Sequence, residues 1–260
     1  MSENLQLGHV TCNYTATDEF LEQAKTWLSE DTFHHVVTLN PEMVLLAEHD
    51  ARFREAVGAA ELRVPDGSGL IWARWYLRSE FWSLLPSLVA FSFRSAERVS
   101  GVDLVTKLSE LALQAGESVY LLGGTVYQNT HTRQYLNRKF PELSVHASPH
   151  HTFDVTGPES ILQDIQEKKP SVLFVAYGAP KQSVWIETHR KNLPSVRIAV
   201  GVGGAFAILS EDRPRAPHFF RKRNLEWLWR LLLEPSRLPR IWNAVVRFPA
   251  MVHRQKTRPS

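Results

Sequence analysis

The stretch Val196-Arg197-Ile198-Ala199-Val200-Gly201-Val202-Gly203-Gly204-Ala205 carries the clearest indication of fold class. Its first seven residues are mostly apolar and β-branched, which is typical of a strand in a parallel sheet that helices cover on both faces. The glycines that follow predict a tight turn. A turn of this kind brings backbone N–H groups close to a phosphate. The stretch therefore predicts a buried strand whose carboxyl end faces an anionic ligand.

Further strands of the same kind alternate with helical patterns over the first 210 residues. Strands are predicted at His34–Leu39, Leu62–Val64, Ser118–Leu122, Leu143–Ala147 and Val172–Tyr177. Helices are predicted at Asp103–Ala115, Val126–Arg138, Ser160–Lys168 and Lys181–Arg190, and after the candidate N-cap Thr17-Asp18. This alternation predicts an α/β protein with a Rossmann-like, mostly parallel sheet flanked by helices.

The composition restricts the classes of protein to which the chain can belong. At 260 residues and 43% hydrophobic, the chain can bury the core of one large domain, or of a domain with an appendage. The single cysteine, Cys12, excludes an internal disulfide and predicts a reducing compartment. Residues 1–4 contain no apolar run, so we expect no secretion signal. The longest mostly apolar run, Phe81–Phe93, is shorter than the roughly 20 residues that a spanning helix needs.

Positive charge is concentrated at the end of the chain. From residue 213 onward there are twelve Lys or Arg residues and two acids, a balance of about +10 in a chain whose net charge is +3. The preceding residues therefore carry about −7, and prolines cluster at 214, 217, 235 and 239. We predict an α/β domain over 1–210 and a basic, amphipathic helical appendage over 211–260, which we call the tail.

The tail combines leucine and tryptophan residues at helical spacing with repeated arginines. Pro235 and Pro239 predict that it is divided into at least two helices. Such segments fit an element that lies on an anionic membrane. A solvated helix packed on the body is the alternative. Binding of nucleic acid is a weaker third interpretation, because the apolar content exceeds what phosphate neutralisation requires.

Three polar residues follow two of the predicted strands. Asp66 comes directly after Leu62–Val64 and Pro65, and Thr38 and Asn40 end His34–Leu39. The carboxyl ends of strands are where open α/β sheets bind ligands, so Asp66 is a candidate general base. The alternative is that Asp66 is an ordinary turn residue. For Asn40 the local sequence favours a cap of the helix that begins at Pro41 over a role as a ligand.

Glycines mark the other strand ends. Three junctions could present backbone amides to a phosphate, and Lys181 adds a positive charge to one of them. The candidate residues at these junctions for binding an anionic ligand are Gly123, Gly124, Gly178, Pro180, Lys181, Gln182, Gly201, Gly203 and Gly204. Each junction is weak evidence by itself, because glycine often serves only the geometry of a turn. Together they predict an anionic ligand at this edge of the sheet.

Several motifs are absent. The chain has no Gly-x-Gly-x-x-Gly fingerprint and no Walker loop, which disfavours ordinary dinucleotide binding and P-loop chemistry. It has no Asp-x-Asp pair for a divalent ion, and its eleven histidines lack the spacing of metal ligands on a helix. We expect no metal site and no cofactor.

Taken in order, these motifs resemble the WecG/TagA/CpsF family of bacterial glycosyltransferases. The matching residues are Thr38-Leu39-Asn40, Pro65-Asp66-Gly67-Ser68-Gly69, Arg98 to Asp103, Leu122-Gly123-Gly124, Gly178-Ala179-Pro180-Lys181-Gln182, Val200 to Gly204, Arg215-Ala216-Pro217 and Leu225 to Arg240. Each motif is common, but the ordered set is specific.

The resemblance implies a metal-independent, inverting transferase. It would move a sugar, N-acetylmannosamine or glucose, from a UDP-sugar to a polyprenyl-diphosphate-linked saccharide at the inner face of the cell membrane, in cell-surface polysaccharide synthesis. Asp66 falls on the family's presumed base, Thr38 and Asn40 on its helper residues, and Gln182 on a donor-site glutamine. The arginines implied to reach the acceptor diphosphate and the membrane are Arg98, Arg215, Arg221, Arg230, Arg237 and Arg240.

Three departures lie on the side expected to hold the nucleotide. Ser183 stands where the family often has Glu, Ala207 where an Asp is usual, and Thr152 where an aromatic residue is common. They keep open a second hypothesis, a non-catalytic nucleotide-sugar-binding or membrane scaffold protein of the same fold. The segment Trp75 to Ala96 is longer and more apolar than usual, and is either a second membrane-contacting hairpin or an insert packed on the body. We expect no nucleic-acid partner, and whether the chain forms a homo-oligomer stays open.

Overall fold

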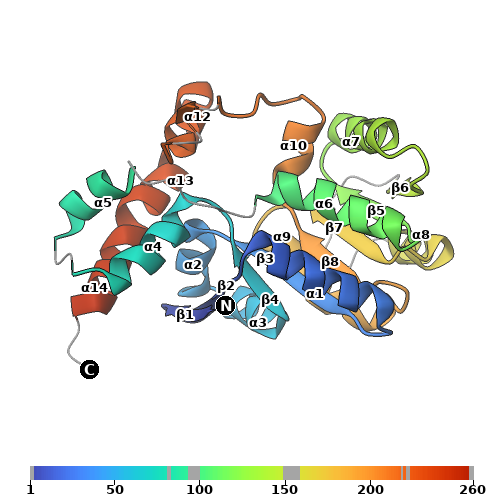
Figure 1. The fold of residues 1–260 in the computed structure, drawn as a ribbon, viewed down its shortest axis with the longest axis horizontal. Coiled ribbons are helices and arrows are strands. Elements are labelled where there is room, and N and C mark those ends of the chain that lie inside the picture. Colours follow the sequence, from blue (N-terminus) through green and yellow to red (C-terminus); the bar gives the residue numbers. More distant parts are fainter. Residues whose placement is uncertain are drawn as a thin grey trace.

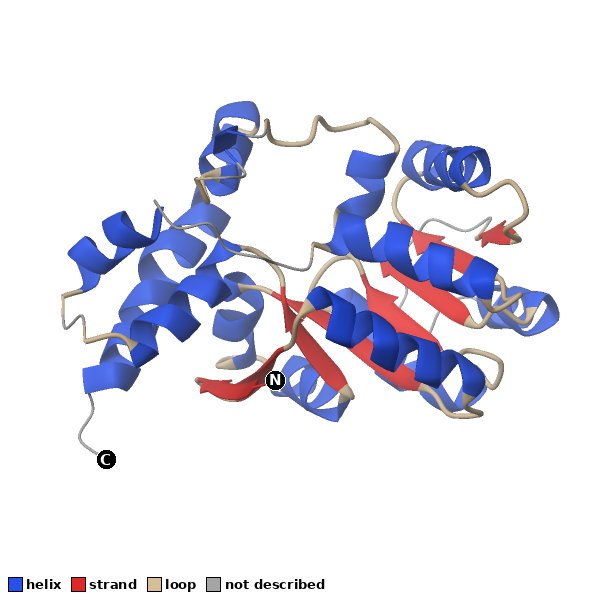
Figure 2. Ribbon diagram, in the orientation of Figure 1, coloured by secondary structure: helices blue, strands red, loops and turns tan. Residues whose placement is uncertain are grey.

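The computed structural model describes residues 3–80, 83–92, 100–148, 159–217, 219–220 and 223–257. It confirms the predicted α/β class, with a six-stranded parallel sheet between layers of helices (Figures 1 and 2). The strands are β3 (His34–Leu39), β4 (Leu62–Pro65), β5 (Val119–Gly123), β6 (Val145–Ala147), β7 (Val172–Ala176) and β8 (Ile198–Gly201). Their order across the sheet is β4-β3-β8-β7-β5-β6.

The direction of winding reverses between β3 and β8. The chain leaves β3 for β4 on one side, and reaches β8 from β7 on the other side. The two central strands pair in parallel, with Val37 opposite Gly201. Open α/β sheets bind ligands outside the carboxyl ends of the strands at such a switch point. The topology therefore points to the edge where Asp66 and the glycine turns were predicted.

Alternating strand residues build the two faces of the sheet, as the period of two requires. Val119 and Leu121 of β5 pack in one core cluster with helices α1 and α6, whereas Tyr120 and Leu122 pack in another with α8 and α9. Figure 1 shows α1 and α6 in front of the sheet. The helices of this part are α1 (Thr17–Ser29), α2 (Pro41–Ala47), α3 (Ala51–Ala59), α4 (Ser68–Arg78), α5 (Leu84–Ser92), α6 (Gly101–Gln114), α7 (Val126–Lys139), α8 (Glu159–Lys168), α9 (Lys181–His189), the 3₁₀ turn η1 (Arg190–Asn192) and α10 (Ala205–Leu209).

Of the two helix caps predicted from the sequence, one is confirmed and the other is wrong. Asn40 caps α2 as expected, since its side-chain oxygen accepts a hydrogen bond from the N–H of Met43 at 3.0 Å. The prediction that Thr17-Asp18 caps α1 is wrong. Thr17 is already the first helical residue, and the N-cap position is Ala16, which has no side-chain cap. Thr17 and Asp18 therefore lie in the first turn, where an acidic residue still favours the helix dipole.

The tail is divided as the prolines predicted. Its elements are α12 (Glu226–Leu233), the 3₁₀ turn η2 (Pro235–Arg237), α13 (Leu238–Trp242), the π-helical turn η3 (Asn243–Arg247) and α14 (Phe248–Thr257). Figure 1 shows the chain after α10 crossing from the sheet to α12 and then descending through α13 and α14 beside α4.

The end of the tail belongs to the core of the body. Phe248 and Val252 of α14 are fully buried in a cluster with α2, α3, α4 and an amino-terminal hairpin that the sequence analysis did not predict. This hairpin consists of the antiparallel strands β1 (Glu3–Leu7) and β2 (Val10–Tyr14). The side-chain amide of Gln255 donates to the carbonyl of Gln6 at 2.8 Å. The first and last described segments of the chain therefore support each other.

The apolar segment that follows α4 packs partly on the body. Phe91 of α5 is buried, and Leu84 and Leu88 pack against the same core cluster as α4 and α14. Leu85 of the same helix is 74% exposed. Among the described residues, no helix has both the length and the hydropathy to cross a membrane.

Candidate active site

The candidate base, Asp66, lies at the carboxyl edge of the sheet beside the end of β3. β4 pairs with β3 up to Pro65, opposite Leu39, and the N–H of Asp66 then donates to the carbonyl of Leu39 at 2.7 Å. Gly67, which follows, has a φ of 91°, a value that glycine adopts without strain. This turn leads directly into α4 and leaves Asp66 half-buried at the edge.

Thr38 and Asn40 are at the adjoining strand end, but each side chain already has a structural contact. The buried hydroxyl of Thr38 donates to the carbonyl of Gly201 at 2.7 Å, which joins β3 to β8 at the switch point. The Asn40 cap uses only the side-chain oxygen, so capping leaves the two amide N–H donors of that side chain unused. The sequence analysis correctly named the cap but missed the bond between Thr38 and Gly201, which only the pairing of the strands creates.

Gln182 connects the loops that follow β7 and β8. Its side-chain oxygen accepts hydrogen bonds from the N–H of Gly178 at 3.1 Å and from the N–H of Gly203 at 3.0 Å. The side chain is 2% exposed, and a Cβ added at Gly201 would lie 2.5 Å from its nitrogen. Glycine at 201 therefore makes room for Gln182. Lys181, the first residue of α9, precedes Gln182 and is exposed.

The turn after β5 is held against its neighbour. Gly123 and Gly124 have φ values of 88° and 72°, and the N–H of Gly124 donates to the carbonyl of Ala176 at 3.2 Å. A Cβ at Gly124 would lie 3.2 Å from the ring of Phe206. The glycine ends of β5, β7 and β8 thus meet at one edge of the sheet, as the sequence predicted.

Two of the three departures on this side can be placed. Ser183 is fully buried in α9, and Ala207 is 3% exposed in α10. Thr152 is outside the described residues. Neither Ser183 nor Ala207 supplies a charged group to the edge.

The predicted acceptor arginines divide into three groups. Arg98 and Arg221 are outside the described residues. Arg215 lies on the segment that follows α10, and its guanidinium binds both carboxylate oxygens of Asp103, at 2.9 and 3.1 Å. Asp103 is in the first turn of α6, and the sequence analysis assigned it no partner.

The remaining arginines are Arg230, Arg237 and Arg240, and Arg237 shares a carboxylate of the tail with Arg213. Glu234 pairs with Arg237 at 2.5 Å and with Arg213 at 3.2 Å, and the hydrogen bond from Arg237 lowers the pKa of Glu234. Glu42 lies in the first turn of α2. Burial raises the pKa of Glu42, while the positive charges of Arg240, Arg237 and Arg230 act in the opposite direction.

Asn224 fastens the tail beside Asp66. The hydroxyl of Ser68 donates to the backbone carbonyl of Asn224 at 3.5 Å, and the side chain of Asn224 donates to the carbonyl of Phe91 at 3.4 Å. Asn224 has a φ of 58°, which Asn tolerates better than most residues. This contact, which the sequence analysis missed, places the start of α12 next to the turn that carries Asp66. In the sequence, the only indication of this contact is that Asn224 stands within a basic, aromatic segment.

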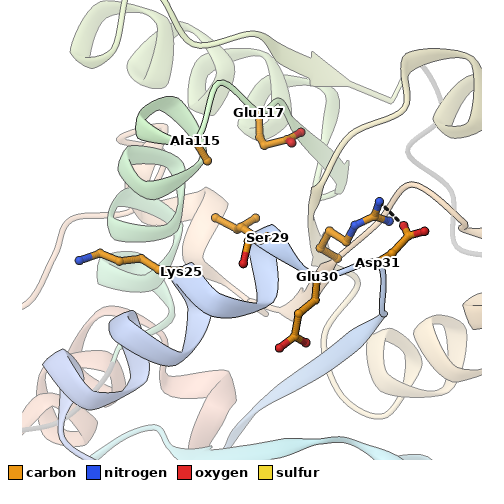
Figure 3. A pocket seen from close by; sticks show the side chains of 8 residues that line it. Lys25, Ser29, Glu30, Asp31, Ala115 and Glu117 are labelled. Atoms are coloured by element: carbon orange, nitrogen blue, oxygen red, sulfur yellow. Dashed lines mark ion pairs between the residues drawn. The ribbon is translucent and has the colours of Figure 1, made fainter.

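One cavity lies at the opposite edge of the sheet. It has a volume of about 600 Å³ and is lined mainly by polar residues (Figure 3). Its lining is Lys25, Leu28, Ser29, Glu30, Asp31, Ala115, Glu117 and Arg197. These residues precede β3, β5 and β8, so the cavity faces the amino ends of the strands and is separate from Asp66. Within the described ranges, no three His, Cys, Asp or Glu side chains gather as metal ligands would.

Comparison with known proteins identifies the family whose model the chain matches. Residues 5–260 match the model of the family described as "Glycosyl transferase WecG/TagA/CpsF family". The chain is 29% identical over 225 residues to a Staphylococcus aureus protein of strain MRSA252 named N-acetylglucosaminyldiphosphoundecaprenol N-acetyl-beta-D-mannosaminyltransferase. The match covers 86% of this chain and 82% of that protein, and proteins of the same name from strains NCTC 8325 / PS 47 and COL match to the same extent.

Proposed function

The chain belongs to the WecG/TagA/CpsF family of glycosyltransferases, and from this premise we propose that it transfers a hexose or N-acetylhexosamine from a UDP-sugar to a polyprenyl-diphosphate-linked saccharide. N-acetylmannosamine and glucose are the candidate sugars. The name of the Staphylococcus aureus relatives supports the former, together with an acceptor that carries N-acetylglucosamine on a diphosphate lipid. The product would be an intermediate of bacterial cell-surface polysaccharide.

The observation that carries the proposal is the position of Asp66 at the switch-point edge. In the proposed reaction Asp66 accepts the proton of an acceptor hydroxyl while that oxygen bonds to the anomeric carbon of the donor sugar. The bond from that carbon to the UDP oxygen breaks on the opposite face, so the configuration inverts and UDP leaves as an anion. A single carboxylate is sufficient for this chemistry when other groups stabilise the leaving diphosphate.

The glycine turns are the proposed donor site. The N–H groups of Gly124, Gly178 and Gly203 already donate within the protein, so the diphosphate of UDP would be met by other backbone N–H groups of these turns, and Lys181 adds charge at the same edge. Because the Gln182 oxygen binds the N–H groups of Gly178 and Gly203, we assign Gln182 to shaping this site as well as to contacting the donor. The proposal needs neither a metal nor a cofactor, and the amides and arginines would supply the stabilising charge.

The tail is the proposed acceptor site. Arg215, Arg230, Arg237 and Arg240 supply positive charge where the tail crosses the carboxyl edge, and Arg98 and Arg221 would join them. Arginine binds phosphate oxygens by charge-assisted hydrogen bonds. We therefore propose a catalytic domain over 1–210 and an acceptor-binding appendage over 211–260 as a division of function. The two parts share one hydrophobic core, because α14 packs in the core of the body.

Exposed apolar side chains on the tail support a peripheral position on the inner face of the cell membrane. They include Phe219, Leu232, Leu238 and Trp242, which are 56% to 64% exposed. Leu and Trp interleaved with Arg are typical of an element that lies in the interface of an anionic membrane. Leu85 of α5 is exposed in the same way and is a candidate for the same contact.

The deciding experiment is a transfer assay. Detergent-solubilised full-length protein is incubated with UDP-N-acetylmannosamine or UDP-glucose and a lipid-diphosphate-linked N-acetylglucosamine, and the products are identified by mass spectrometry. Transfer of one sugar supports the proposal and identifies the donor. Binding of UDP-sugar without transfer to any acceptor would favour the scaffold alternative, to which the replacements at Ser183 and Ala207 give some support.

A further inference from the structure

One carboxylate of the tail, that of Glu234, contacts arginines from two segments that are far apart in the sequence. The Nε atom of Arg213 lies 3.2 Å from one of its oxygens, and the Nε atom of Arg237 lies 2.5 Å from the other. Arg237 is one of the arginines assigned to the acceptor diphosphate. Arg213 has no part in the proposed reaction, although it shares its carboxylate with Arg237.

The backbone of Arg213 is held to the body of the protein. Its N–H donates to the carbonyl of Ala207 in α10 at 2.8 Å. Because α10 begins directly after Gly203 and Gly204, this bond keeps Arg213 close to the carboxyl edge of the sheet. The side chain of Arg213 then reaches Glu234, which follows α12. Arg213 therefore lies where the body meets the arginines of the tail.

Both arginines contact Glu234 through Nε and leave their outer nitrogens available. In the part of the chain that the structure describes, the Nη atoms of Arg213 and Arg237 have no partner. The side chains are 44% and 24% exposed, so an anion from solvent can reach them. Two positive groups repel each other unless a negative group lies between them. The carboxylate of Glu234 is such a group, and it keeps the two guanidinium groups close enough to bind one anion.

We propose that Arg213 is a further binding residue for the acceptor diphosphate, which it contacts together with Arg237 while Glu234 holds the two guanidinium groups near each other. The inference rests on the proposed function, which assigns Arg237 to this diphosphate. Arginine binds phosphate oxygens by charge-assisted hydrogen bonds, and a diphosphate offers oxygens to two arginines at once. The diphosphate of UDP has the same chemistry. The shared contact with Arg237 of the tail favours the acceptor as its source.

Binding of inorganic pyrophosphate to the full-length protein tests the proposal. Titration calorimetry is performed in detergent, without divalent ions and with saturating UDP, so that the donor site is filled. Arg213→Gln should raise the Kd for pyrophosphate about tenfold, because hydrogen bonds between charged groups are lost. Arg138→Gln is the matched control, because Arg138 is exposed in the last turn of α7 and its replacement removes the same charge. The control should bind as wild type does, and an equal loss in both variants would overturn the proposal.

The substrate KM values and the binding of UDP show which diphosphate Arg213 contacts. Arg213→Gln should raise the KM for the lipid-diphosphate acceptor. It should leave the KM for the UDP-sugar and the Kd for UDP unchanged. A raised Kd for UDP with an unchanged Kd for pyrophosphate would assign Arg213 to the donor, and would contradict the proposal.

Glu234→Gln separates binding by Arg213 from a purely structural effect of its ion pair. This variant breaks the same pair but leaves Arg213 positively charged. The pair is partly exposed, so both variants should melt close to wild type, and Glu234→Gln should change the Kd for pyrophosphate by less than about twofold. If Glu234→Gln and Arg213→Gln weaken pyrophosphate binding equally, Arg213 only fastens the tail to α10 and the proposal is wrong.

Arg237→Gln distinguishes failure of this inference from failure of the proposed function. If Arg237→Gln weakens pyrophosphate binding and Arg213→Gln has no effect, only the role of Arg213 is wrong. If pyrophosphate does not bind to the wild-type protein, and Arg237→Gln leaves the acceptor KM unchanged, the acceptor site itself is wrong and both proposals fail.

Discussion

The side-chain oxygen of Gln182 accepts a hydrogen bond from the backbone N–H of Gly203, 3.0 Å away, and so joins the loops that follow β7 and β8. The same oxygen accepts from the N–H of Gly178. Two backbone N–H groups of the glycine turns are thus already donating to one buried side chain, which fixes the shape of both loops. The glutamine of this motif has a structural part in shaping the edge of the sheet.

Gln182→Ala should therefore lower stability as well as activity. Two half-buried backbone N–H groups would lose their acceptor, and each such loss costs at most about 1–3 kcal/mol. We expect a reduced free energy of unfolding in urea and a raised KM for the UDP-sugar. Gln163→Ala, at an exposed position of α8, is the matched control and should change neither quantity. A Gln182→Ala protein as stable as wild type would show that water or a neighbouring group replaces the amide.

Asp66→Asn should abolish transfer and leave folding and UDP binding largely intact. Loss of a general base costs on the order of 10²–10⁴ in rate. The amide keeps the size of the side chain, and the backbone bond from Asp66 to Leu39 does not depend on the carboxylate. Turnover is measured with the lipid-linked acceptor, and folding is followed by thermal melting. Activity above about a third of the wild-type rate would show that Asp66 is not the base, because a general base usually contributes a rate factor of at least about 10².

Transfer should continue in excess EDTA. The proposed stabilisation of the leaving UDP uses backbone N–H groups and positively charged side chains, which serve the same purpose as a metal ion. Initial rates with EDTA and with added magnesium or manganese should agree within error. Strict dependence on a divalent ion would contradict the proposed donor site.

Variants of Arg215 and Asp103 can separate the proposed binding of diphosphate by Arg215 from the structural effect of its ion pair with Asp103. Both side chains are more than 40% exposed, so the pair should contribute no more than about 1 kcal/mol to folding. Arg215→Gln should lower turnover on a short, water-soluble diphosphate acceptor, because a charge that binds the diphosphate is removed. Asp103→Asn leaves that charge in place and should retain most of the activity. Equal losses in the two variants would mean that Arg215 only fastens the segment after α10 to α6.

Phe248 and Trp242 should have opposite effects on stability and membrane binding. Phe248 is fully buried in the shared core, so Phe248→Ala should destabilise the protein by about 3–5 kcal/mol. Trp242 is 57% exposed, and Trp242→Ala should leave the melting temperature nearly unchanged. It should, however, weaken binding to anionic liposomes, measured by co-sedimentation. Unchanged sedimentation of Trp242→Ala would exclude this side chain from the membrane contact.

Local patterns were sufficient for the class of fold and the edge of the site. The strand His34–Leu39 and the start of α2 at Pro41 follow from a β-branched run and from the cap and proline chemistry of Asn40-Pro41. Such features depend on residues a few positions apart, so they are encoded in the sequence at short range. In contrast, no local pattern marked the strands β1 and β2, because they pack against α4 and against α14, which lies at the other end of the chain.

Long-range contacts decided what individual side chains do. The sequence placed Thr38, Asp66 and the glycines at strand ends and the basic tail after residue 210. Only the order of the strands sets Thr38 against Gly201, and only the return of the tail brings Arg215 to Asp103. Side-chain periodicity and capping depend on neighbours within one turn or strand, whereas hydrogen bonds and charge pairs between distant segments depend on how those segments pack. For that reason the sequence by itself determined the sheet and its candidate edge, and the tertiary structure alone decided which groups meet there.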